Sequence, residues 1–322
     1  MKYRSLGKTG LKVSEIGYGA WGIGGALWHG ASDSESMKAL NKAVDCGINF
    51  FDTALFYGDG HSERLIGKLL KERRDGLIVA TKIPPKNLRW PAREGSSLRE
   101  IFPASHIRES TEQSLRNLGV ECIDLQQFHV WLDDWTDDQE WIEEVAKLRE
   151  ERKIRFLGIS INNHEPRNAL RLIRSGRVDT VQVIYNIFDQ SPEDELFPEC
   201  QRSGIGIIAR VPFDEGALTG SVSPATRFEE KDFRNWYFRG DRKTEVWERV
   251  RHLEPLVGAE ASTLAELALR FCLHHSALST VIPGMRTESH VEANCALSDG
   301  RDLSAETVQE LRKHRWKKNY YR

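Results

Sequence analysis

The sequence predicts an α/β fold of the (β/α)8 TIM barrel class, organised as a single domain over residues 1–322. Short apolar segments alternate with segments of helical periodicity along the whole chain, which is typical of a parallel sheet with right-handed crossovers. Eight such units are recognisable in the 322 residues, and no linker or change of composition separates them. Eight units in one continuous chain favour a closed barrel over an open sheet.

The N-terminal residues predict a β-hairpin that precedes the barrel. Two short extended pieces, residues 3–6 and 11–13, flank the turn-forming run from Gly7 to Gly10. The first barrel strand is expected at residues 16–19, followed by a glycine-rich loop over residues 21–32 and a helix over residues 34–46.

The remaining strands and helices follow in strict alternation. Strands are expected at residues 48–51, 77–81, 122–128, 154–159, 180–184, 205–209 and 280–282. Helices are expected at residues 62–70, 105–118, 139–151, 166–175, 193–203, 243–260, 262–274, 288–297 and 304–314. Ser62 is expected to cap the first of these helices, and Pro166 to lie in the first turn of the fourth. The final helices are additional C-terminal elements.

A long loop over residues 211–241 carries six aromatic side chains. Connections of this length inside a compact domain are usually functional. The aromatic content indicates a loop that packs down onto the protein.

The composition limits the classes of function. A formal net charge of -2 and a pI near 6.6 argue against a general nucleic-acid binder or a membrane-surface protein. No apolar run is long enough to span a membrane, and the first residues do not resemble a secretory signal. The cysteines are scattered and match no metal-ligand spacing, which predicts reduced thiols, no metal site and a cytoplasmic location. They are Cys46, Cys122, Cys200, Cys272 and Cys295. The oligomeric state is left open.

Polar residues follow successive predicted strands, at the ends that open onto the active-site face of a barrel. They are Asp52 with Tyr57, Lys82, His129, Ser160, Gln182 and Arg210. Each has a structural alternative, since Lys82 could extend its ammonium to solvent, His129 could be a core histidine and Asp52 could cap a turn. Their occurrence together on one face favours an active site.

The chemistry available to these groups is specific. A tyrosine has an ordinary pKa of about 10, and a neighbouring cation lowers it. Lys82 is the candidate cation, provided that Asp52 pairs with the lysine ammonium and keeps it charged. His129 could donate a hydrogen bond to a substrate carbonyl. A carbonyl that gains a proton from Tyr57 must also gain a hydride, which indicates a nicotinamide cofactor.

These residues resemble the motifs of the aldo-keto reductase family. The matching segments are Phe51-Asp52-Thr53, Tyr57-Gly58, Ser62-Glu63 with Gly67, Thr81-Lys82, Asp124 with Gln127-Phe128-His129, Gly158-Ile159-Ser160, Val181-Gln182-Val183 with Tyr185-Asn186, Gly216 to Gly220, and Val281-Ile282-Pro283-Gly284. The resemblance extends from the hairpin to about residue 297. Individually these motifs are weak, and together they are specific.

The resemblance implies a role for each matching position. Asp52, Tyr57, Lys82 and His129 would form the catalytic tetrad, with Tyr57 as general acid and base. Ser160 and Gln182 would bind the nicotinamide carboxamide. The pyrophosphate would lie along the loop that contains Phe213, Gly216, Leu218 and Gly220. Gly284, Arg286, His290 and Asn294 would surround the adenosine end.

The cofactor implied is NADPH, with NADH less favoured, because the guanidinium of Arg286 suits a 2′-phosphate. The structural alternative for Arg286 is an exposed arginine at a helix start. Three positions depart from the family pattern. Ile161 precedes Asn162 where an asparagine commonly follows the serine directly, Arg210 replaces an aromatic beside the nicotinamide, and His290 replaces glutamine or arginine. We hypothesise that Arg210 repels an oxidised, positively charged ring and so weakens NADP+ relative to NADPH.

Four aromatic residues that follow strand ends are candidates for the wall of a substrate pocket: Trp21, Trp28, Phe56 and Trp131. Packing beneath the loops is an equal alternative for each. Aromatic walls suit apolar and sugar-like aldehydes alike, so the substrate is predicted only as a small-molecule carbonyl. The expected function is NADPH-dependent reduction of an aldehyde or ketone to an alcohol. The alternative is a cofactor-binding regulatory or scaffold subunit with little turnover.

Overall fold

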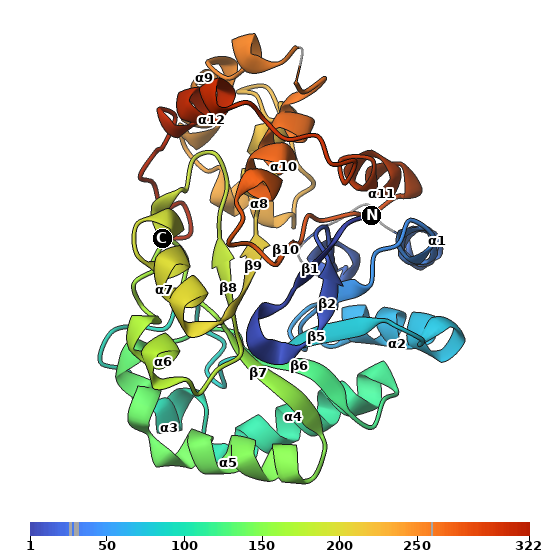
Figure 1. Ribbon diagram of the computed structural model, residues 1–322, viewed down its shortest axis with the longest axis vertical. Coiled ribbons are helices and arrows are strands. Elements are labelled where there is room, and N and C mark those ends of the chain that lie inside the picture. The colour runs from blue at the N-terminus through green and yellow to red at the C-terminus, as the bar shows by residue number, and fades with distance from the viewer. Residues whose placement is uncertain (26–27, 29–31, 259) are drawn as a thin grey trace.

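A computed structural model describes residues 1–25, 28, 32–258 and 260–322 of the chain, and its centre is a sheet of eight parallel strands (Figure 1). The strands are β3 (Tyr18–Gly19), β4 (Phe50–Asp52), β5 (Ile78–Ile83), β6 (Ile123–Phe128), β7 (Ile154–Ser160), β8 (Thr180–Ile184), β9 (Gly206–Arg210) and β10 (Thr280–Val281). Each strand pairs with its neighbour in chain order. The predicted succession of strands is therefore confirmed.

The sheet closes on itself between its first and last strands. Parallel bridges join Ile16 to Val281 and Gly19 to Gly284. The amide of Gly17 donates to the carbonyl of Val281 at 2.8 Å, and the amide of Gly19 donates to the carbonyl of Pro283 at 3.0 Å. The predicted (β/α)8 barrel is thus the observed fold. We call the junction of residues 16–19 with 281–284 the barrel seam.

The predicted N-terminal hairpin is also present. β1 (Tyr3–Ser5) pairs antiparallel with β2 (Lys12–Ser14), and a 3-10 turn at Gly7–Thr9 joins them. A methyl group added at Gly7 would lie 2.3 Å from the amide nitrogen of Gly206, the first residue of β9, so the hairpin sits against the N-terminal ends of the strands. Leu6 of the hairpin packs with core residues of β4, β6 and β9. The hairpin therefore covers the end of the barrel opposite the candidate site.

Helices surround the barrel, as Figure 1 shows. They are α1 (Asp33–Asp45), α2 (His61–Arg73), α3 (Leu98–Ile101), α4 (Ala104–Leu118), α5 (Gln139–Glu150), α6 (Leu170–Ser175), α7 (Leu196–Ser203), α8 (Phe233–Tyr237), α9 (Arg242–Arg251), α10 (Leu264–His274), α11 (Glu288–Cys295) and α12 (Ala305–Arg312). The start of α1 carries a capping box, in which Ser32 and Glu35 satisfy each other's backbone amides. Among the described residues, no helix has the length and apolar character that a membrane crossing requires.

Some local expectations are wrong, each for a specific reason. Gly60 occupies the N-cap position of α2, and Ser62 is buried with its hydroxyl donating to the carbonyl of Ala20. Pro166 lies in the turns before α6, which begins only at Leu170. The helix expected over residues 243–260 ends at Arg251, because Pro255 cannot donate an intrahelical hydrogen bond and lies in a separate 3-10 turn.

The loop over residues 211–241 is folded onto the protein, as its aromatic content predicts. It contains a 3-10 segment (Asp214–Thr219) and the short helix α8. The rings of Phe233 and Tyr237 lie 5.9 Å apart, and Tyr237 contacts both Tyr320 and Tyr321 of the C-terminal segment. The loop and the C-terminal segment therefore form one packed unit.

Candidate active site

A buried ion pair lies at the C-terminal ends of β4 and β5. The ammonium of Lys82 lies 2.5 Å from Oδ1 of Asp52 and donates a second hydrogen bond of 2.7 Å to the carbonyl of Thr53. Both side chains are almost completely shielded from solvent. Burial acts to lower the pKa of Lys82, but the charge of Asp52 and the neighbouring Tyr57 outweigh it, so that the pKa is raised. Lys82 therefore carries a permanent positive charge inside the barrel mouth.

Tyr57 follows β4 on the loop that leads to α2, and its hydroxyl lies 3.4 Å from the Lys82 ammonium. The sequence suggested that Lys82 would lower the pKa of this phenol. Instead the pKa of Tyr57 is raised, because complete burial disfavours the phenolate more strongly than Lys82 favours it. The hydroxyl is consequently protonated at neutral pH and available as a proton donor.

His129 directly follows β6 and faces the same phenol. The rings of Tyr57 and His129 lie 5.7 Å apart in an edge-to-face arrangement. Burial, reinforced by the charges of Lys82 and Arg210, holds the pKa of His129 well below its usual value. The imidazole is therefore neutral, and its buried Nδ1 has no hydrogen-bond partner. A neutral imidazole can donate an N–H to a carbonyl oxygen without charge repulsion from Lys82.

Two glutamines complete the surroundings of Asp52. Gln127 on β6 donates to Oδ2 of Asp52 at 3.2 Å, and Gln182 on β8 donates to the same oxygen at 2.7 Å. Gln127 belongs to the Gln127-Phe128-His129 motif, but it is not among the site residues predicted from the sequence. Its position two residues before His129 at a strand end is the signal that could have identified it. The two amides hold the carboxylate that in turn holds Lys82.

The ends of β7, β8 and β9 carry the other predicted polar residues. Ser160 pairs with Gln182 in register, and Arg210 pairs with Ile184. The Nη2 of Arg210 donates to the carbonyl of Ile161 at 3.1 Å and to Oδ1 of Asn163 at 2.7 Å. The buried Nε of Arg210 lacks a hydrogen-bond partner. Ile161 and Asn163 thus position the guanidinium that stands where the resemblance implies an aromatic residue.

Asn162, the residue after Ile161, is held by contacts of its own. The Asn162 amide donates at 3.2 Å to the carbonyl of Ala92 and, at the same distance, to the Glu165 carboxylate. These contacts do not bring the Asn162 amide to the position that the resemblance gives to an asparagine directly after Ser160.

The segment after β9 has an irregular backbone suited to close approach by a ligand. Asp214, Glu215 and Gly216 all have positive φ values, of 48°, 55° and 98°. Gly220 ends the segment in the left-handed conformation, which glycine adopts without strain. Phe213 and Leu218 anchor the segment by packing against the core. The predicted pyrophosphate loop is therefore a fixed turn.

Two acidic residues of this turn are bound by the C-terminal segment. Asp214 is buried and pairs with Lys318, while the Glu215 carboxylate accepts a hydrogen bond from the hydroxyl of Tyr321. Burial raises the pKa of Glu215 to about 7, although the Tyr321 hydrogen bond and Arg210 oppose the shift. The sequence did not indicate Tyr321 as a neighbour of this loop.

The predicted adenosine-end residues lie at the end of the barrel seam, just after it and on α11. A methyl group added at Gly284 would meet open space, and Arg286 lies across Gly22 with its guanidinium 5.8 Å from the ring of Trp28. Burial and the nearby Arg234 lower the pKa of Arg286, while Asp232 and Glu229 act in the opposite direction. His290 lies in the first turn of α11, and Asn294 is buried further along it.

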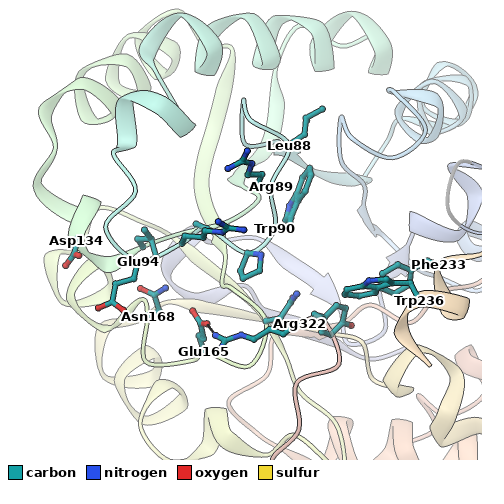
Figure 2. Close-up of a pocket in the computed structure, with 16 residues that line it drawn as sticks. Leu88, Arg89, Trp90, Glu94, Asp134, Glu165, Asn168, Phe233, Trp236 and Arg322 are labelled. Carbon is teal, nitrogen blue, oxygen red and sulfur yellow. Dashed lines mark hydrogen bonds and ion pairs between the residues drawn. The ribbon is translucent and has the colours of Figure 1, made fainter. Parts of the chain in front are cut away.

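A cavity of about 1270 Å³ opens over the ends of β5, β6 and β7. Figure 2 shows its wall, where Trp90, Phe233 and Trp236 contribute aromatic surface and Arg322 faces Glu165. The ring of Trp90 also lies 5.7 Å from that of His129, so the cavity is adjacent to the candidate catalytic groups. Trp90 was not predicted, although an aromatic residue beside Pro91 in the loop after the Lys82 strand was a usable signal.

The four aromatic residues proposed for the pocket separate into two groups. The ring of Phe56 lies 4.4 Å from that of Trp90 in a tilted arrangement, and the ring of Trp21 lies 6.2 Å from that of Tyr57 and 5.6 Å from that of Trp28. These residues lie around the candidate site. Trp131 instead is fully buried against Phe128, Trp135 and Trp141, beneath the loop. Trp131 therefore matches the structural alternative, which was aromatic packing beneath the loops, and not a wall of the substrate pocket.

The site has features that a nicotinamide cofactor would use. The Nε of Arg210 is a buried polar atom without a partner, and such atoms normally find one. The open space at Gly284 and the positive-φ turn at Glu215 and Gly216 allow close approach at the other end. The residues present therefore fit such a group. Among the described residues, no cluster of three or more potential ligands could hold a metal ion.

Comparison with known proteins gives consistent matches over almost the whole chain. Residues 15–315 match the model of the aldo/keto reductase family. The chain is 31% identical to the aldo-keto reductase YhdN of Bacillus subtilis over 316 residues, covering 97% of this chain and 92% of that protein. It is 29% identical to the NADH-specific methylglyoxal reductase of Escherichia coli, covering 92% and 93%. The solved structure of the glycerol dehydrogenase AKR11B4 from Gluconobacter oxydans aligns with a TM-score of 0.78 at 27% identity, covering 97% of this chain and 94% of that one.

Proposed function

Because this chain belongs to the aldo/keto reductase family and is an oxidoreductase dependent on a nicotinamide cofactor, we propose that it reduces a small aldehyde or ketone with NADPH, using Tyr57 as the proton donor. The observation that carries the proposal is the 3.4 Å separation of the Tyr57 hydroxyl from a lysine ammonium fixed by Asp52. This arrangement supports the proposal, because a phenol hydroxyl lies beside a buried, positively charged ammonium.

The bound nicotinamide cofactor supplies the hydride that a carbonyl carbon must receive. Tyr57 supplies the proton to the carbonyl oxygen, which is feasible because its raised pKa keeps the hydroxyl protonated. The reaction leaves a phenolate, and Lys82 stabilises that charge from its position beside the oxygen. Solvent then returns the proton to Tyr57.

His129 has a separate role in this proposal. As a neutral imidazole it orients the substrate by donating an N–H to the carbonyl oxygen before proton transfer. Asp52 does not touch substrate. Together with Gln127 and Gln182 it holds Lys82 in position.

The preference for NADPH rests on Arg286, which is supported by the nearby Arg234. Two guanidinium groups at the adenosine end favour a 2′-phosphate, although Asp232 and Glu229 reduce the local positive potential. NADH is therefore the second cofactor to test, and the Escherichia coli relative is named as NADH-specific.

The substrate is proposed as a small-molecule carbonyl that fits between the aromatic residues around Tyr57 and the cavity beyond Trp90. Methylglyoxal is a rational first member of a test panel, since a relative is named for its reduction. The panel extends to aliphatic, aromatic and sugar-derived aldehydes, because Trp90 and Phe56 can pack on any of them.

The test is consumption of NADPH, and separately of NADH, in the presence of the carbonyl panel. The wild type is expected to consume cofactor, and Tyr57→Phe is expected to lose activity by roughly 100-fold or more, the usual contribution of a positioned acid. Tyr3→Phe is the matched control, because Tyr3 is an exposed tyrosine whose hydroxyl donates to the carbonyl of Gly47. Cofactor binding without turnover of any carbonyl would instead favour the regulatory or scaffold function.

A further inference from the structure

Helices α1 and α11 lie side by side on the outside of the barrel, close to the N-terminus (Figure 1). They follow β3 and β10, the parallel strands that meet at the barrel seam, so the two helices run in the same direction. An ion pair joins them, with the Lys42 ammonium 2.5 Å from the Glu292 carboxylate. This ion pair shows the register of the two helices, with Lys42 opposite Glu292.

A pair of cysteines lies one helical turn beyond that ion pair. Cys46 follows Lys42 by four residues at the C-terminal end of α1, and Cys295 follows Glu292 by three as the last residue of α11. Residues three or four apart share a helix face. Because the helices are parallel, this spacing brings the two thiols to facing positions one turn beyond the ion pair, and burial together with Cys46 raises the pKa of the Cys295 thiol.

Both thiols are free and only partly buried. The other cysteines are placed differently, since Cys200 and Cys272 are inside the core and Cys122 lies near the end of α4. Two partly buried cysteines on neighbouring helices differ from the scattered thiols that the sequence predicted.

We propose that Cys46 and Cys295 are a redox modification site, at which a low-molecular-weight disulfide such as oxidised glutathione converts the two thiols into an intramolecular disulfide. In the first step a Cys46 thiolate attacks the oxidant, forming a mixed disulfide and releasing one glutathione thiol. In the second step Cys295 attacks the Cys46 sulfur, loses its proton and displaces the second glutathione thiol. Two protein thiols are oxidised and one glutathione disulfide is reduced to two thiols.

The order of the two steps follows from the surroundings of Cys295. Burial, with a further contribution from Cys46, raises the pKa of the Cys295 thiol to about 12. A thiolate at Cys295 is therefore rare, and Cys46 is the thiol that reacts with the oxidant. The second step is expected to accelerate as the pH rises, because Cys295 must lose its proton to attack the Cys46 sulfur.

The cross-link would have a defined structural effect. It would enclose every strand from β4 to β10 in one covalent loop and join the two helices that flank the seam. A long closed loop restricts the unfolded chain strongly, so the oxidised protein is expected to unfold at a higher temperature, by roughly 5 °C.

The experiment uses the full-length protein equilibrated with either reduced or oxidised glutathione, followed by thiol titration in denaturant and peptide mapping. The wild type is expected to fall from five thiols to three, with Cys46 and Cys295 recovered in one linked peptide pair. Cys46→Ser and Cys295→Ser should each lose the rise in melting temperature. Cys122→Ser is the matched control and should retain both the linkage and the rise.

Three results would overturn the proposal. These are five thiols remaining after oxidation, linkage only between different chains on a non-reducing gel, or recovery of Cys46 and Cys295 solely as separate glutathione adducts. Peptide mapping of the wild type decides the question even if a serine variant folds poorly. None of these readouts depends on the proposed reductase activity.

Discussion

The side-chain amide of Gln182 donates a hydrogen bond of 2.7 Å to Oδ2 of Asp52, although the two residues are 130 positions apart in the chain. Asp52 thus accepts Lys82 on one oxygen and two glutamine amides on the other. A residue expected at the nicotinamide carboxamide is therefore also part of the network that fixes the lysine. A substitution of Gln182 is therefore expected to affect the position of Lys82, and a substitution of Lys82 to affect that of Gln182.

Asp52→Asn is expected to destabilise the protein strongly, because it leaves the Lys82 ammonium buried without a counter-charge. Breaking a buried ion pair on one side typically costs about 3–5 kcal/mol. Urea unfolding measures the change. Asp45→Asn is the matched control, since it removes an exposed pair with Arg73 that is worth about 1 kcal/mol or less. Equal losses in the two variants would contradict the prediction.

Glu215 is expected to make stability depend on pH. Its pKa is raised to about 7 in the folded protein from an ordinary 4.5, so the folded state binds the proton more tightly. This shift adds up to about 3 kcal/mol to the free energy of unfolding. The contribution is fully present below about pH 4.5 and is lost as the pH rises through 7.

Melting temperatures measured from pH 5 to pH 8 test this expectation. The wild-type value should fall with rising pH, and Glu215→Gln should flatten the profile. Tyr321→Phe removes a hydrogen bond that favours the carboxylate, so its profile should fall at a higher pH than that of the wild type. A profile unchanged in Glu215→Gln would assign the pH dependence to other groups.

Gly19→Ala is expected to disrupt the barrel seam. The added methyl group would lie 2.7 Å from the carbonyl oxygen of Ile282 and 2.9 Å from that of Pro283, and backbone cannot move aside cheaply. A loss of about 1–3 kcal/mol on chemical denaturation is expected for such overpacking. Gly284→Ala, at the bridge partner, is the control because its methyl group meets open space.

Arg210→Tyr is expected to reduce the difference in affinity between NADP+ and NADPH. A guanidinium held by Ile161 and Asn163 repels a positively charged ring and not a neutral one. The ratio of the dissociation constants for NADP+ and NADPH, measured by fluorescence titration, should fall by roughly tenfold, equivalent to about 1.4 kcal/mol. Arg286→Ala should weaken both forms alike. An unchanged ratio in Arg210→Tyr would refute the hypothesis.

The barrel and the approximate position of the site were readable from the sequence because their signals are local. An apolar strand followed by a polar residue is visible within a dozen positions, and the barrel topology then brings Asp52, Lys82 and His129 to one face. The same reasoning could not reveal the Gln182–Asp52 bond or the contact of Tyr321 with Glu215. These depend on side-chain directions and on distant segments meeting.

The protonation state of Tyr57 shows a further limit. From residue types alone, the neighbouring lysine indicated a lowered pKa, but the degree of burial decides the sign, and burial cannot be counted from a motif. Trp131 is similar, since position after a strand end does not distinguish a wall of the pocket from the layer beneath it.

The barrel seam also has a consequence for the order of folding. The contacts that complete the ring join residues 16–19 to residues 281–284, which are among the most distant in the chain. Contacts between such remote segments are slow to form, because a long stretch of disordered polypeptide must first be brought together. Until then β3 and β10 present unpaired edges, which invite pairing with other molecules. We therefore expect nascent or refolding chains to be most prone to aggregation just before the ring is complete.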